Sequence, residues 1–173
     1  MRGGGAPLHK PRASEITSFE RISLAELKSP VVRQGVDHWT ALRGARRFPA
    51  RQDIHPRDIK AILANLLLIR VLDGGSDFEF RIAGDAQIQT YAIDFAGKRL
   101  SELKHTSPAY GYILAGLFGY VAQFGEPVAL RGKFGPGFPN VRIAYCETAF
   151  MPLGSGDAVD HLLGCTAFVG NGS

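Results

Sequence analysis

The chain has 173 residues, a formal net charge of +4 and a sequence pI near 9.3, and 45% of its residues are hydrophobic. This apolar content excludes a disordered chain and is enough for one folded domain. The longest apolar run, residues 61–69, contains Asn65 and is far shorter than the roughly 20 residues of a membrane span. Two cysteines form no disulfide framework, and no apolar N-terminal stretch is typical of a secretion signal, so we expect a cytoplasmic protein with reduced thiols.

Residues 1–14 hold three consecutive glycines and two prolines, which predicts a disordered tail. Residues 15–64 are predicted to form an N-terminal helical extension, whose first part, 15–28, is either extended or a short docked helix. Ser29-Pro30 begins a helix, because serine caps and proline suits the first helical position, and this helix buries Trp39 and ends at Gly44. His55-Pro56 begins a second helix.

Residues 65–170 are predicted to form the core of the domain. Residues 66–72 and 78–83 form a β-hairpin around the turn DGGS, with Phe80 and Ile82 on its inner face. Short helices follow at 85–93 and 101–103, and a longer helix runs from Pro108 to about Phe124.

The chain ends in three predicted strands, at residues 126–134, 140–152 and 158–169, joined by glycine-rich turns. The predicted order is two strands, then a helical segment, then a three-stranded meander. This order predicts an α+β fold, with a five-stranded antiparallel sheet that has its helices on one face.

The basic excess is concentrated in residues 33–60, whose densest stretch is RGARRFPAR. A surface for single-stranded nucleic acid would add stacking aromatic residues, and only Trp39 and Phe48 flank this stretch. We interpret it as a solvated helix end, where arginine favours the negative pole of the helix, and expect no nucleic-acid partner.

Several strings in this order, among them HWTALRGARRFPARQDIHPRDI, FEFRIAGD, GKRLSEL and ETAFMPL, resemble a family of short bacterial PAS-domain proteins of mostly uncharacterised function. The resemblance covers about Pro30–Val169. It implies a PAS-like sensory or signalling domain that binds a small ligand or a protein partner, a homodimer included, with no output domain of its own. The positions that match are Trp39, Arg43, Gly44, Pro49, Arg51, Asp53, Pro56, Arg81, Gly84, Gly97, Glu147 and Pro152.

Three of the matching residues, Arg51, Arg81 and Glu147, are not needed for packing. They are interpreted either as ion pairs that tie the leading segment to the sheet, or as a site where an arginine at the cavity mouth receives an anionic ligand. Trp39, Arg43 and Arg51 are predicted to be structural or interface residues.

The helix at 108–124 contains Gly111, Gly116 and Gly119, each of which costs about 1 kcal/mol relative to alanine. Such a cost suggests close packing against a backbone or a ligand, and we therefore expect a cavity between this helix and the sheet. The predicted ligand-binding residues are Arg81, Phe80, Ile82, Tyr112, Leu117, Tyr145 and Glu147.

No catalytic signature is present, and we expect no enzyme. The five histidines are scattered without metal-ligand spacing, so no metal site is predicted. His105 lies where some haem-binding PAS domains place an axial ligand, but a lone histidine there is more often structural, and no cofactor is assigned. Two alternatives stay open: a protein-interaction or oligomerisation module with a filled cavity, and a small-molecule enzyme on a similar cone-like α+β fold.

The last hairpin is predicted to turn at residues 154–156, which makes Cys146 and Cys165 cross-strand neighbours. Neighbouring thiols in a reducing compartment are expected to be inert core residues, and a redox-sensitive pair is the alternative.

Overall fold

A computed structural model describes residues 16–91, 95–106, 108–134 and 143–170. Its strands are β1 Ile16–Ile22, β2 Leu66–Leu72, β3 Asp77–Ala83, β4 Val128–Phe134, β5 Ile143–Ser155 and β6 Ala158–Gly170. Its α-helices are α1 Pro30–Arg43, α2 Asp85–Tyr91, α3 Leu100–Thr106 and α4 Pro108–Phe124. Short 3₁₀ segments are η1 Leu24–Glu26, η2 Arg51–Asp53, η3 Pro56–Asn65 and η4 Asp73–Gly75. The predicted N-terminal tail lies outside the described residues.

The six strands form one antiparallel sheet in the order β1-β4-β5-β6-β2-β3. The predicted α+β class is confirmed, but the predicted count of five strands is wrong. The extra strand is β1, which lies in the predicted N-terminal extension, where the sequence allows an extended segment or a short helix, and it pairs with β4 as an edge of the sheet. The ring of Phe19 lies against Gly132 of β4, where the missing side chain leaves room for it.

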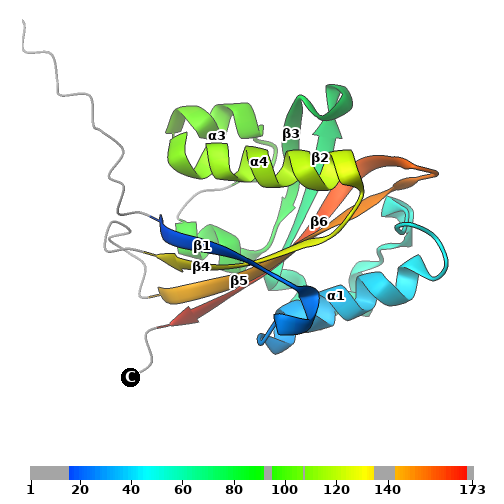
Figure 1. The fold of residues 1–173 in the computed structure, drawn as a ribbon, viewed down its shortest axis with the longest axis horizontal. Coiled ribbons are helices and arrows are strands. Elements are labelled where there is room, and N and C mark those ends of the chain that lie inside the picture. Colours follow the sequence, from blue (N-terminus) through cyan, green and yellow to red (C-terminus); the bar gives the residue numbers. More distant parts are fainter. Residues whose placement is uncertain (1–15, 92–94, 107, 135–142, 171–173) are drawn as a thin grey trace, which may run out of the picture.

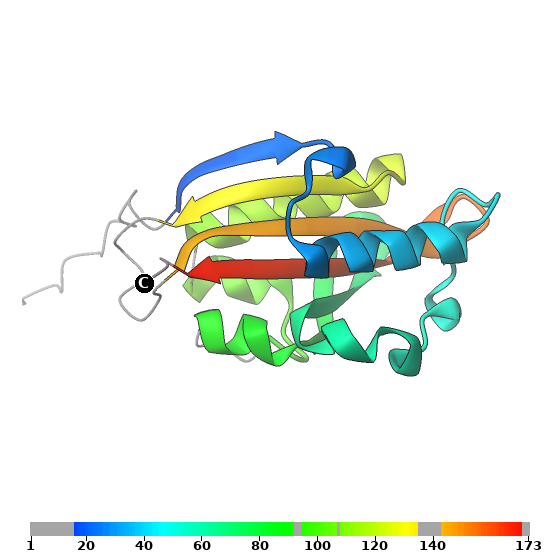
Figure 2. The ribbon, with the colours of Figure 1, turned by 90° about the horizontal axis from the view of Figure 1, so that it is seen from below.

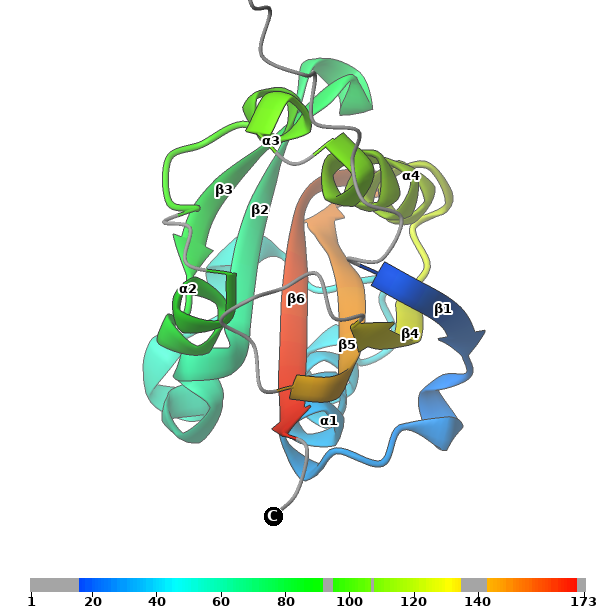
Figure 3. The same cartoon turned by 90° about the vertical axis from the view of Figure 1, so that its left-hand side faces the viewer.

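Helices cover both faces of the sheet, not one face as predicted. Figure 1 shows the sheet between α3 and α4 on one side and α1 on the other, and Figure 3 shows α2 on the same side as α3 and α4. Each face has its own hydrophobic cluster. The reason is visible in β2, whose residues Leu66, Leu67, Leu68 and Ile69 are all buried, because a strand with two apolar faces needs a cover on each. We refer to the two sides as the α1 face and the α4 face.

The helix α1 packs along the sheet (Figure 2) and follows its sequence signals. The Ser29 hydroxyl accepts a hydrogen bond from the Val32 N–H at 3.4 Å, and Gly44 ends the helix with φ of +56°. Trp39 is 3% exposed, and its indole Nε1–H donates to the carbonyl of Pro152 at 2.8 Å. Trp39 therefore anchors α1 to its own sheet.

A β-bulge changes the second strand of the first hairpin. Leu68 pairs with Ile82, whereas the next residue, Ile69, pairs with Phe80, so Arg81 is the extra residue. Because of this extra residue, the side chains beyond the bulge point to the opposite face of the sheet from the one that the sequence pattern predicts. Phe80 stays buried on the α4 face, but Ile82 is 49% exposed.

The last hairpin turns later than predicted, and the two cysteines are not neighbours. Ser155 pairs with Ala158, and a second bulge beside Gly154 places Cys165 opposite Ala149. Cys146 lies three residues from that point, about 10 Å along the strand at roughly 3.3 Å per residue. An odd separation also puts the two thiols on opposite faces, Cys146 on the α4 face and Cys165 on the α1 face.

Candidate functional site

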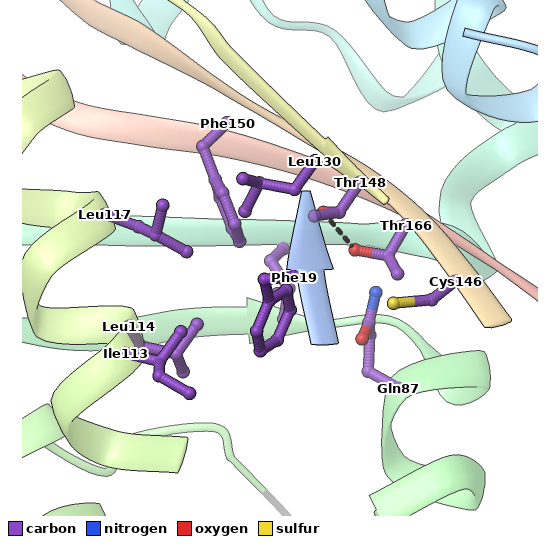
Figure 4. Close-up of a pocket in the computed structure, with 11 residues that line it drawn as sticks. Phe19, Gln87, Ile113, Leu114, Leu117, Leu130, Cys146, Thr148, Phe150 and Thr166 are labelled. Atoms are coloured by element: carbon purple, nitrogen blue, oxygen red, sulfur yellow. Dashed lines mark hydrogen bonds between the residues drawn. The ribbon is translucent and has the colours of Figure 1, made fainter. Parts of the chain in front are cut away.

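A small cavity lies between α4 and the sheet, in the predicted position (Figure 4). Its volume is about 30 Å³, which is room for about one or two water molecules. Its wall is formed by Phe19, Leu67, Gln87, Ile113, Leu114, Leu117, Leu130, Cys146, Thr148, Phe150 and Thr166. The cavity is thus far smaller than the several hundred Å³ of a typical small-molecule site.

One end of this cavity is polar. The hydroxyls of Thr148 and Thr166 are hydrogen-bonded to each other at 2.6 Å, and both residues are buried. The side chain of Gln87, on α2, is also buried, and its Nε2 lies 3.4 Å from the carbonyl of Asn65. None of these three polar residues is among those predicted from the sequence. The correct hairpin register would have found the two threonines, because it places them directly opposite one another.

Aromatic side chains fill the rest of the space below α4. The Phe118 ring is fully buried and lies 5.4 Å from Phe78, 6.1 Å from Phe80 and 5.0 Å from Phe150, measured between ring centroids. The inter-ring angles are those of edge-to-face packing, which stabilises such clusters. Phe80 therefore belongs to a packed core and does not line the cavity.

Most of the predicted cavity lining lies elsewhere. Leu117 lines the cavity, whereas the side chain of Tyr112 is 67% exposed. Ile82 faces outward beyond its bulge. Tyr145 lies two residues before Glu147 in a regular ladder and so shares the α1 face with it.

The predicted close packing around the glycines of α4 is wrong for Gly116 and Gly119. A Cβ atom added to Gly116 or Gly119 would meet nothing within 4 Å, so both positions look toward open space and not toward the sheet. Only Gly111 is closely packed, against the backbone of Lys104 on α3.

Glu147 is fully buried on the α1 face and does not reach the cavity. Its carboxylate accepts hydrogen bonds from the backbone N–H groups of Lys28, at 3.0 Å, and Ser29, at 2.7 Å, and from Arg131 Nη2 at 3.2 Å. These contacts bind the segment before α1 to the sheet. Their geometry corresponds to the ion-pair interpretation of Glu147 and differs from the predicted ligand contact.

Arg51 and Arg81, far apart in the sequence, lie together in a groove. They line it with Leu68, Ile82 and His161, and its volume is about 330 Å³. Arg81 Nη1 is paired with Glu79 at 2.9 Å, and His161 Nδ1 lies 2.8 Å from Asp160. Arg43 lies apart from this groove, with its guanidinium 5.4 Å from the centre of the Trp39 ring.

Both thiols are held in the protonated form by burial. Loss of solvent raises the pKa of Cys146 to about 11 and that of Cys165 to about 12. Because the thiolate is the reactive form, the two cysteines are poor nucleophiles at neutral pH.

Across residues 16–91, 95–106, 108–134 and 143–170, no cluster of His, Cys, Asp or Glu could hold a metal ion. Within the same ranges, no helix combines the length and the apolar character required to cross a membrane.

A family model described as "PAS domain" matches residues 27–109, from the segment before α1 through α2 and α3 to the start of α4. The match supports a PAS domain in this chain, and a PAS domain supports a role of the sensory or signalling type in general. A search of curated proteins found no match.

Proposed function

We propose that this PAS domain signals by binding a protein partner through the outward face of α4, and not by enclosing a ligand beneath that helix. The observation that carries the proposal is the combination of a nearly filled core with an uncharged, exposed helix above it. A cavity of about 30 Å³ leaves no room for a metabolite-sized ligand without rearrangement.

The composition of α4 is unusual for a helix at the surface. None of its 17 residues is charged, and yet Tyr112 is 67% and Phe124 is 47% exposed. Helices that are apolar on all sides are normally buried. Gly116 and Gly119 lie between these aromatic side chains along the exposed face and would allow a partner backbone to approach closely.

Cations surround this face. Lys104 Nζ lies 5.2 Å from the centre of the Tyr112 ring, and Arg21 lies 4.7 Å from that of Tyr120. Arg47 donates to the carbonyl of Phe124 at the end of the helix. A partner with an apolar centre and an acidic rim complements this surface, whereas a second copy would bring like charges together.

The experiment places a photoreactive benzoylphenylalanine at Tyr112 or at Phe124 of the full chain in cells. The control is the same group at Leu63, which is 40% exposed on η3. We expect a specific adduct with one acidic protein from both α4 positions and none from Leu63. Failure of both α4 positions to crosslink, or crosslinking only to a second copy of the chain, would contradict the proposal.

A pair of variants at one position then tests the contact with the purified partner. Gly116→Ala and Gly116→Glu both fit, because the space above Gly116 is open. We expect Gly116→Glu to weaken binding at least tenfold, since it puts a carboxylate against the apolar centre of a partner whose rim is acidic, and Gly116→Ala to change it by less than about threefold. Equal affinities of the two variants would argue against this face.

The proposal contains no catalytic step, and the absence of enzymatic activity stays a prediction. It retains the cytoplasmic location expected for a chain with two reduced thiols.

A further inference from the structure

We propose that the groove lined by Arg51, Arg81 and His161 binds a small organic anion, with its carboxylate or phosphate group on the two guanidinium groups and its apolar part on Leu68 and Ile82. This site is separate from the outward face of α4 and goes beyond the function proposed above.

Three separate segments build the groove. Arg51 comes from η2, Arg81 from β3 and His161 from β6. The bulge in β3 is what turns Arg81 and Ile82 out of the regular alternation and toward this side of the sheet. At about 330 Å³ the groove has the size of a small-molecule site, about ten times the volume of the cavity below α4.

The charge of the groove is positive. Arg51 is half-buried, and its side chain forms no ion pair or hydrogen bond with any other residue that the structure describes. Arg70 lies on the same face, two residues after Leu68 and directly opposite His161 in the ladder between β2 and β6. Arg51 and Arg70 have no ion pair with any residue that the structure describes, and gathering such arginines on one face is unfavourable unless an anion neutralises them.

The acidic residues nearby cancel only part of this charge. Glu79 is already bonded to Arg81 through one guanidinium nitrogen, and Asp160 is bonded to His161. Arg81 therefore keeps guanidinium N–H groups that can donate to a ligand. All guanidinium N–H groups of Arg51 are available in the same way. Guanidinium groups of this kind match the geometry of carboxylate and phosphate oxygens.

The apolar residues of the groove indicate more than an inorganic ion. Leu68 forms its buried floor, and Ile82 is 49% exposed beside the arginines. A ligand with an apolar body covers Ile82 and gains from its removal from water, whereas a bare phosphate ion does not.

The test is a titration of the full chain followed by amide chemical shifts, at constant ionic strength. The probes are phenyl phosphate and benzoate, with benzyl alcohol as the neutral control and inorganic phosphate as the control without an apolar part. We expect at least one aromatic anion to bind with millimolar or better affinity and to shift amides next to Arg51, Arg81 and His161. Whichever of phenyl phosphate and benzoate binds more tightly shows whether the groove prefers a phosphate or a carboxylate. We expect inorganic phosphate and benzyl alcohol to bind more weakly than that probe.

Variants separate this site from general attraction to a basic protein. Arg51→Gln and Arg81→Gln should each weaken binding about tenfold, whereas Arg33→Gln on the exposed side of α1 should leave it unchanged. The proposal is overturned if neither aromatic anion binds at millimolar concentration, if benzyl alcohol binds equally well, or if the groove variants bind as the wild type does. Because Arg51→Gln leaves α4 untouched, crosslinking from Tyr112 reports on the proposed function independently.

Discussion

The two faces of the sheet are closed by helices of opposite character. On the α1 face, an amphipathic helix points Arg33 and Asp37 to solvent and is fixed by Trp39 and Glu147. On the α4 face, a helix without charge leaves aromatic side chains and glycines in solvent, above a core filled by phenylalanines.

This contrast between the two helices distinguishes residues that stabilise the domain from residues that are available for binding. On the α1 face, Trp39 and Glu147, two of the residues that match the family resemblance, are explained by contacts within the domain. On the α4 face, the exposed residues Tyr112 and Phe124 are not required to close the core. Removing the buried Trp39 should therefore cost stability, whereas removing the exposed Tyr112 should leave stability largely intact.

The largest expected effect is that of Trp39→Ala. It removes a buried ring and its hydrogen bond to Pro152, and we expect a loss of about 3–5 kcal/mol in the free energy of unfolding. The matched change on the other face, Tyr112→Ala, should cost less than about 0.5 kcal/mol. Chemical denaturation measures both, and similar losses for the two variants would remove the distinction between the faces.

The two thiols provide a second test, because one lies on each face. Burial raises the pKa of Cys146 to about 11 and that of Cys165 to about 12, from an ordinary value of 9.0. The folded state thus favours the protonated thiols, and their contribution is complete below pH 9 and is lost as the pH rises toward the raised values. Each thiol should contribute a fall of about 1.4 kcal/mol per pH unit in that window.

Denaturation of the wild type, Cys146→Ala and Cys165→Ala between pH 8 and 11 isolates these contributions. Each substitution should make the alkaline loss of stability less steep. An unchanged slope in either variant would mean that the thiol in question is accessible to solvent.

The smallest expected effects come from two helical glycines that differ only in what faces them. A Cβ at Gly35 of α1 would lie 3.0 Å from both Cβ and Sγ of Cys165, whereas a Cβ at Gly116 would meet nothing. We expect Gly35→Ala to lose about 1 kcal/mol through overpacking and Gly116→Ala to gain up to about 1 kcal/mol from helix propensity. Thermal or chemical unfolding decides the signs, and equal signs would contradict the comparison.

Local signals predicted the elements well. Ser29, Pro30 and Gly44 define α1 because caps act within one turn of the chain, and the bounds of β2 and nearly all of β6 follow from apolar runs between turn residues. The sequence also contains a signal for helices on both faces of the sheet, because the run LLLI in β2 is typical of a strand that is buried on two sides.

The site was harder to predict, because it depends on register and direction. The bulge in β3 moved Ile82 out of the core, and the later turn of the last hairpin, together with the bulge beside Gly154, separated Cys146 from Cys165. In α4 the hydrophobic pattern surrounds the helix, so the sequence could not indicate whether Gly116 faces the sheet or solvent. The meeting of Arg51 with Arg81 arises from tertiary packing, for which no local pattern exists.

The hydrogen bonds that Glu147 accepts from the segment before α1 affect the order in which the chain folds. The Glu147 carboxylate holds Lys28 and Ser29, 119 and 118 residues earlier in the chain. Synthesis proceeds from the N-terminus, so α1 is complete long before its acceptor leaves the ribosome. During that interval α1 carries an apolar stripe with no sheet to cover it, and the finished domain forms only after β5 and β6 arrive. A nascent chain that stalls before residue 147 therefore presents Trp39 to the surrounding chaperones.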